Sequence, residues 1–94
     1  MRNITLGRTD RKVSAISLGT WSFGGANMNG RIPVGWADQS ETDSINALKR
    51  CWEVGINHWD TADVYGEGRS ESIIGKMWNK ISRDDIFLAT KLGW

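Results

Sequence analysis

Three side chains that could move a proton stand where strands are expected to end. Asp60 and Tyr65 lie in the segment HWDTADVYGEGRSE, and Lys91 lies in FLATKLGW. Because a strand places alternate residues on one face, Asp60 and Lys91 can meet at the ends of neighbouring strands. The carboxylate would keep the ammonium charged, and the ammonium would lower the pKa of the Tyr65 phenol from about 10. A phenol tuned in this way is a competent proton donor, as carbonyl reduction requires.

Strands and helices alternate along the chain that must position these groups. We expect an N-terminal hairpin formed by residues 3–6 and 12–14. Three strands are expected over residues 15–19, 56–62 and 86–90, and two helices over residues 41–54 and 70–78. Such alternation predicts parallel strands with helical crossovers, hence an α/β fold. The pattern alone does not separate an open sheet from a barrel.

The two expected helices show apolar residues at helical spacing. The run Ser40-Glu41-Thr42-Asp43 offers capping oxygens before the first helix and Gly55 a C-cap after it, and Ser70 is the expected cap of the second helix. The residues predicted to face the core are Ile45, Leu48, Cys51 and Trp52 in the first helix, and Ile73, Ile74, Met77 and Trp78 in the second.

Residues 22–39 form an unusually long connection that is rich in glycine. Connections longer than about 12–15 residues are commonly functional or disordered. We interpret this one as a mobile lip of the site, with a passive surface insertion as the alternative.

Composition excludes several classes of function. The charged residues make up 24% of the chain with a net charge of +1, and the basic ones are scattered among acidic ones, so no nucleic-acid partner is expected. No apolar run approaches the roughly 20 residues of a membrane span, so no membrane partner is expected either. The single Cys51 fits packing within a reducing, cytoplasmic environment.

The segment Gly66-Glu67-Gly68-Arg69-Ser70-Glu71 resembles part of a dinucleotide fingerprint, but the third glycine is missing. Glu71 stands in its place, and its charge would oppose a pyrophosphate at the start of a helix. The following strand ends in Lys91 rather than in a ribose-binding acid. We therefore disfavour an open Rossmann sheet.

The ordered motifs resemble the aldo-keto reductase family instead. They are Leu6-Gly7-Arg8-Thr9-Asp10, Leu18-Gly19-Thr20-Trp21, Asp60-Thr61-Ala62 with Tyr65-Gly66, Gly68-Arg69-Ser70-Glu71 and Ala89-Thr90-Lys91. Each motif is weak alone, but the ordered set covers nearly the whole chain. The form of the glycine-rich motifs is most similar to the bacterial and potassium-channel-β-like branch.

The resemblance implies a (β/α)8 TIM barrel, of which residues 1–94 would be a single partial domain. Such barrels typically need about 250 residues, so we expect an N-terminal hairpin that plugs the barrel floor, followed by a βαβαβ portion of an incomplete barrel. It also implies that Tyr65 acts as general acid, tuned by Lys91 and Asp60, and that Gly19, Thr20, Trp21 and Asp60 lie at the cofactor.

The cofactor implied by the resemblance is NADP(H), which supplies the hydride, and the substrate is a small carbonyl compound. The family's catalytic histidine follows the lysine, so His58 is expected to be a hydrogen-bonded core residue, and no metal site is expected. Trp21 is either a pocket wall or one more core aromatic. The family's cofactor phosphates are held by later loops, so the 94 residues alone are not expected to bind NADPH tightly or to reduce carbonyls.

Two classes of function remain after this reasoning. One is a reductase, whether a truncated copy, a fragment or one part of a split enzyme. The other is a non-catalytic binding or assembly protein. In either case open sheet edges predict self-association or pairing with a complementary fragment.

Overall fold

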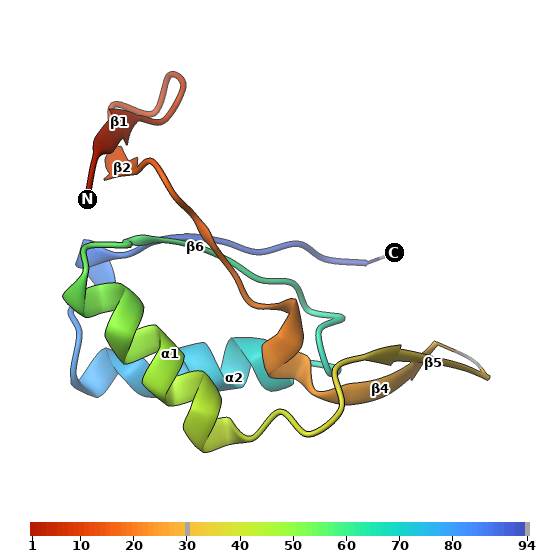
Figure 1. Cartoon of the computed structure of the whole chain (residues 1–94). Coiled ribbons are helices and arrows are strands. Elements are labelled where there is room, and N and C mark those ends of the chain that lie inside the picture. The colour runs from red at the N-terminus through yellow and green to blue at the C-terminus, as the bar shows by residue number, and fades with distance from the viewer. Residues whose placement is uncertain (30, 94) are drawn as a thin grey trace.

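Three short parallel strands form the centre of the structure, and both α-helices cover one face of them (Figure 1). The computed structural model describes residues 1–29 and 31–93. Its elements are β1 (Asn3–Thr5), β2 (Lys12–Ser14), β3 (Leu18–Gly19), the 3-10 helix η1 (Trp21–Gly24), β4 (Ala26–Asn29), β5 (Ile32–Gly35), α1 (Glu41–Glu53), β6 (His58–Asp60), α2 (Arg69–Gly75), the 3-10 helices η2 (Lys76–Asn79) and η3 (Arg83–Asp85), and β7 (Phe87–Ala89).

The predicted α/β class is confirmed. The parallel sheet has the order β3-β6-β7, with Gly19 opposite Asp60 and Asp60 opposite Ala89. No further strand pairs with β3 or β7 among the described residues, and they form no closed barrel. The barrel, and the view of this chain as an incomplete part of one, stay predictions.

The predicted N-terminal hairpin is confirmed, with β1 antiparallel to β2 and Ile4 opposite Val13. It lies at the end of the parallel sheet where the strands begin (Figure 1). The Ser14 backbone N donates to Asn57 Oδ1 at 2.7 Å, and the Asn57 backbone N donates to Ser14 Oγ at 3.2 Å. This reciprocal pair joins the hairpin to the segment that enters β6.

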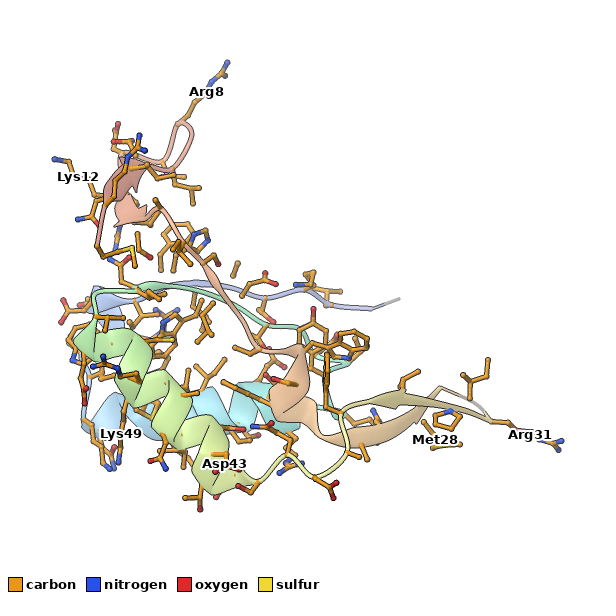
Figure 2. The ribbon with its side chains drawn as sticks, in the orientation of Figure 1. Arg8, Lys12, Met28, Arg31, Asp43 and Lys49 are labelled. Carbon is orange, nitrogen blue, oxygen red and sulfur yellow. The ribbon has the colours of Figure 1, made fainter. Side chains whose placement is uncertain are left out.

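Residues 22–39 are more regular than we expected. They contain most of η1 and the antiparallel pair β4–β5, in which Met28 lies opposite Pro33 and Ala26 opposite Gly35. Pro33 is tolerated because a two-stranded ribbon leaves some N–H positions facing solvent. The two strands are too short to show a clear alternation of apolar and polar residues, and the glycines of this segment indicated an irregular connection. In Figure 2 the labelled Met28 and Arg31 lie far from the sheet, near the end of this hairpin.

The first helix begins where predicted, but its C-cap is Val54 rather than the predicted Gly55. Ser40 is the N-cap, and its Oγ accepts a hydrogen bond from the Asp43 backbone N at 3.0 Å. Gly55 follows the C-cap with a φ of +86°, a left-handed conformation that favours glycine. Leu48 is fully buried as predicted, but Trp52 is 37% exposed. Helical spacing assigns a side chain to one side of the helix, yet it cannot tell whether a neighbour covers that position.

The predicted cap of the second helix is wrong. Gly68 is the N-cap of α2, with a φ of +97°, and Ser70 lies inside the first turn, fully buried. Its hydroxyl is engaged by buried groups of the sheet, so it does not cap the helix. The predicted burial of Ile73, Ile74 and Met77 is confirmed, and they pack in one core with Leu48, Trp59 and Ile86.

The predicted strands β6 and β7 are present, although shorter than expected, and their side chains alternate as predicted. Trp59 is fully buried on the helix side and stacks on the partly buried Trp78 at 6.1 Å. On the opposite face the half-buried His58 ring lies edge-on to Phe87, with centroids 5.4 Å apart. His58 is therefore not the buried core residue that we expected. Within the described part of the chain, no helix has the length and apolar character of a membrane span.

Candidate active site

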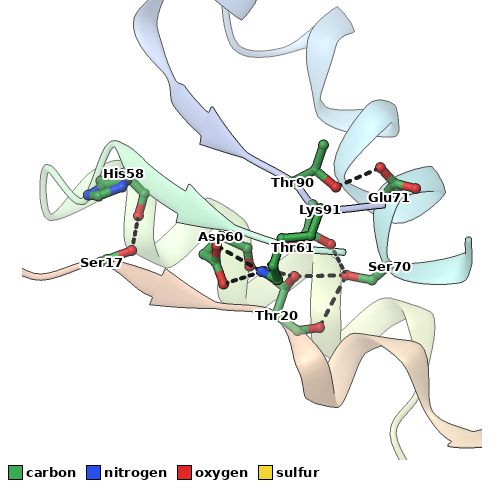
Figure 3. A network of polar contacts seen from close by, with 9 residues as sticks. All are labelled: Ser17, Thr20, His58, Asp60, Thr61, Ser70, Glu71, Thr90 and Lys91. Carbon is green, nitrogen blue, oxygen red and sulfur yellow. Dashed lines mark hydrogen bonds and ion pairs between the residues drawn. The ribbon is translucent and has the colours of Figure 1, made fainter. Parts of the chain in front are cut away.

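The carboxyl ends of β6 and β7 bring Asp60 and Lys91 together. Because the two strands are parallel neighbours, residues just past their ends share one edge of the sheet. Lys91 Nζ donates to Asp60 Oδ1 and Oδ2 at 3.1 and 3.0 Å, and to the Thr61 carbonyl at 2.8 Å (Figure 3). The two side chains thus form the pair that strand periodicity predicted.

The electrostatics of this pair favour a charged lysine. The hydrogen bond that Lys91 donates to the Asp60 carboxylate raises the pKa of the Lys91 ammonium above its usual value, and electrostatic interactions with Asp60 and Tyr65 add to this. Partial burial acts in the opposite direction. The side chains are 51% and 42% exposed for Lys91 and Asp60, so water screens the pair.

Tyr65 lies on the turn between β6 and α2, with its ring beside the ammonium. Lys91 Nζ is 5.4 Å from the centre of the Tyr65 ring, within the range of a cation–π contact. The structure therefore gathers all three predicted catalytic side chains at one edge of the sheet. Their catalytic roles stay predictions.

Two glycines hold the Tyr65 turn against η1. A Cβ added to Gly24 would lie 2.6 Å from both Gly66 N and the Tyr65 carbonyl carbon, closer than real Cβ contacts allow. Gly66 itself has a φ of +66° and lies against the Gly24 backbone. The backbone on either side of Tyr65 is thus positioned by direct contact between main chains.

A cavity of about 490 Å³ opens beside these residues, lined by Trp21, Val34, Ala62, Val64, Tyr65, Lys91 and Gly93. Its walls are mainly apolar, and its polar groups converge at Tyr65 and Lys91. A mostly apolar hollow with few converging polar groups is the usual form of a small-molecule site. β5 contributes Val34, so the hairpin β4–β5 belongs to the wall of the cavity.

The residues predicted to contact the cofactor lie in three different settings. Gly19 is exposed on β3 opposite Asp60. Thr20 is fully buried, and its Oγ1 donates to the Asp60 carbonyl at 2.9 Å. Trp21 is 50% exposed and lines the cavity, which favours the pocket over the core for this residue. Their contacts with a cofactor stay predictions.

Sequence reasoning missed two residues of this region. Trp36 packs edge-on against Trp21, with ring centroids 5.8 Å apart, and so braces one wall of the cavity. The signal available in the sequence was the presence of an aromatic residue in a glycine-rich connection. The other is Ser70, which was predicted to cap a helix because of its residue type but has a buried side chain. In the described residues, no group of three or more His, Cys, Asp or Glu side chains could hold a metal ion.

Residues 15–94 match the aldo/keto reductase family, and the chain belongs to it. It is 36% identical over 93 residues to the NADH-specific methylglyoxal reductase of Escherichia coli K12, covering 99% of this chain and 27% of that protein. It is 35% identical over 89 residues to a potassium-channel-β-like protein of Schizosaccharomyces pombe, covering 93% and 23%. The predicted similarity to the bacterial and potassium-channel-β-like members is confirmed, and the chain spans about a quarter of the length of these relatives.

Solved structures agree with this family. The holo form of an aldo-keto reductase from Bacillus halodurans matches with a TM-score of 0.76 and 33% identity, over 99% of this chain and 26% of that one. An aldo-keto reductase from Klebsiella pneumoniae in complex with NADPH matches with a TM-score of 0.65 and 26% identity, over 88% and 25%.

Proposed function

We propose that this chain supplies the proton-transfer site of an NADP(H)-dependent reductase that converts aldehydes or ketones to alcohols. The observation that carries the proposal is the position of Lys91. Its ammonium is held by both Asp60 oxygens and lies beside the Tyr65 ring at the mouth of an apolar cavity.

Each side chain has a separate task in this mechanism. Asp60 and the Thr61 carbonyl hold the Lys91 ammonium in place. The ammonium favours negative charge on the Tyr65 oxygen, so this hydroxyl gives its proton to the substrate oxygen during reduction and takes it back during oxidation. The apolar walls cover one side of the reacting carbonyl, and a partner that shields the half-exposed Asp60–Lys91 pair from water would strengthen these electrostatic interactions.

The cavity fits the nicotinamide end of the cofactor. Trp21 and Ala62 offer apolar surface for a flat ring next to Tyr65, and Lys91 is the only cation among the described residues that line the cavity. When bound, the cofactor supplies the hydride. One cation suits the reacting end better than the several phosphates of the dinucleotide.

We further propose that residues 1–94 by themselves do not bind the dinucleotide tightly and do not reduce carbonyls. In this view the chain works after self-association or after pairing with a complementary chain. β3 and β7 are the outer strands of the described sheet, and outer strands offer backbone groups for pairing. Trp59 packs in the core with the helix residues, so the next residue, Asp60, faces the other side of the sheet, where a partner would shield its half-exposed pair with Lys91 from water. A cytoplasmic location belongs to the same proposal.

The first experiment is a fluorescence titration of the purified chain with NADPH and, separately, NADH, run beside analytical ultracentrifugation. Both cofactors are needed because the Escherichia coli relative is named as NADH-specific. We expect no saturable binding by a monomer. Tight binding by a monomer would contradict the proposal that these residues need a partner.

The second experiment places the site in a barrel. The matching quarter of the Bacillus halodurans enzyme is replaced by this chain, and aldehyde reduction is measured after circular dichroism confirms folding. Tyr65→Phe and Lys91→Met are each expected to lower kcat/KM by about 100-fold or more, the scale of general acid catalysis. The control is Lys76→Met, because the Lys76–Glu41 pair is similarly exposed and neither of its residues lines the cavity. A folded chimera that is inactive, or that keeps its activity in Tyr65→Phe, refutes the mechanism.

A further inference from the structure

Three buried hydroxyl groups lie together beneath the ion pair. Thr20 follows β3, Thr61 follows β6 and Ser70 lies in the first turn of α2, and none of the three is more than 1% exposed. Ser70 Oγ is 2.8 Å from Thr20 Oγ1 and 2.9 Å from Thr61 Oγ1 (Figure 3). One serine thus connects the ends of two neighbouring strands.

The three hydroxyl groups have three hydrogens for four close contacts, so one hydrogen serves two acceptors. Thr20 Oγ1 donates to the Asp60 carbonyl at 2.9 Å, and Ser70 Oγ donates to Thr20, whose carbonyl lies at 3.1 Å and whose Oγ1 lies at 2.8 Å. Each hydroxyl has one hydrogen, so Thr61 Oγ1 is the donor to Ser70 Oγ. Ser70 is therefore at once the acceptor for Thr61 and a donor to the residue that holds Asp60.

Both ends of this chain of hydrogen bonds reach the Asp60–Lys91 pair. The Asp60 carbonyl accepts from Thr20 through both its backbone N, at 3.1 Å, and its hydroxyl. The Thr61 carbonyl accepts from Lys91 Nζ at 2.8 Å. The titratable groups that face the Lys91 ammonium are Asp60 from β6 and Tyr65 from the following turn. The backbone at 60–61 therefore sets where the ammonium lies relative to both.

We propose that Ser70 is a positioning residue for the active site: its buried hydroxyl, acting through Thr20 and Thr61, fixes the backbone that carries Asp60 and receives Lys91. Ser70 itself does not line the cavity. Its importance for catalysis rests on the proposed function, but its effect on the ion pair is a property of this chain alone. Loss of the hydroxyl leaves Thr61 without its buried acceptor, and the strand end is then free to turn away from Lys91.

The test is a pH titration of the Lys91 side-chain nitrogen by NMR in the 94-residue chain labelled with 15N-lysine, with Lys91→Met to assign the signal. In Ser70→Ala we expect the Lys91 pKa to move down, toward its ordinary value. The matched control is Ser44→Ala, because Ser44 is equally buried and its hydroxyl donates to the Ser40 carbonyl at 3.1 Å on α1. Ser44→Ala is expected to leave the Lys91 titration unchanged.

Two further variants keep the test decisive if Ser70→Ala unfolds. Ser70→Cys keeps a weak donor of similar size, and Thr61→Val removes the same hydrogen bond from its other end. Each is expected to lower the Lys91 pKa, Ser70→Cys less than Thr61→Val. Folded Ser70 variants that titrate as the unmodified chain does would overturn the inference. An ordinary Lys91 pKa in the unmodified chain would instead overturn the proposed site, so the two failures are distinguishable.

Discussion

The contact between Gly24 and the turn at residues 65–66 is so close that one added methyl group should measurably destabilise the chain. In Gly24→Ala the new Cβ would start 2.6 Å from two backbone atoms, Gly66 N and the Tyr65 carbonyl carbon. Backbone cannot rotate away as a flexible side chain can, so η1 or the turn must shift. Overpacking of this kind costs about 1–3 kcal/mol.

Gly75→Ala is the matched control, because it adds the same methyl group in open space. Gly75 ends α2 with a φ of −58°, and a Cβ there meets nothing within 4 Å. In a helix, alanine is favoured over glycine by up to about 1 kcal/mol. The two substitutions are chemically identical, so their difference isolates the clash at Gly24.

Urea unfolding, followed by tryptophan fluorescence, measures this difference. A small domain loses about 1 kcal/mol of stability per molar urea, so the midpoint of Gly24→Ala should fall by about 1–3 M, while that of Gly75→Ala should stay or rise. Protein concentration is held fixed, because self-association would change the apparent stability. A Gly24→Ala midpoint equal to that of Gly75→Ala would refute the close approach that positions Tyr65.

Three other predictions concern the core, the thiol and the ion pair. Trp59→Ala should cost about 3–5 kcal/mol in urea unfolding and Trp52→Ala much less, because Trp59 is fully buried and Trp52 is not; equal losses would contradict the core assignment. Burial raises the pKa of the Cys51 thiol, so iodoacetamide at pH 8 should alkylate it more slowly in the folded chain than in urea, and equal rates would contradict its burial. The raised pKa of Lys91 means that its pairing with Asp60 stabilises the fold below the ordinary lysine pKa and that this contribution disappears as the pH rises through the raised value. The contribution is at most about 1 kcal/mol for so exposed a pair. Its disappearance should lower the urea midpoint of the unmodified chain between pH 8 and pH 11, and this part of the decrease should be absent in Lys91→Met.

Much of the fold follows from local patterns in the chain. The capping by Ser40, the turn at Gly55 and the hairpin β1–β2 were predictable because short-range hydrogen bonds and backbone preferences decide them. The hairpin β4–β5 was missed, since its two four-residue strands carry a glycine and a proline, which usually mark an irregular connection. Ser70 was misassigned because a serine near a helix start has the same appearance in the sequence whether it caps the helix or is buried against a sheet.

The sequence by itself determined the α/β class and the pairing of Asp60 with Lys91, because strand periodicity and the parallel arrangement depend only on residue order. Only the tertiary structure decided that Trp36 braces Trp21, that Val34 lines the cavity and that Ser70 connects two strand ends. These contacts join residues from separate elements. Their formation depends on how the helices and the hairpin pack around the sheet, which residue spacing along one strand or helix does not specify.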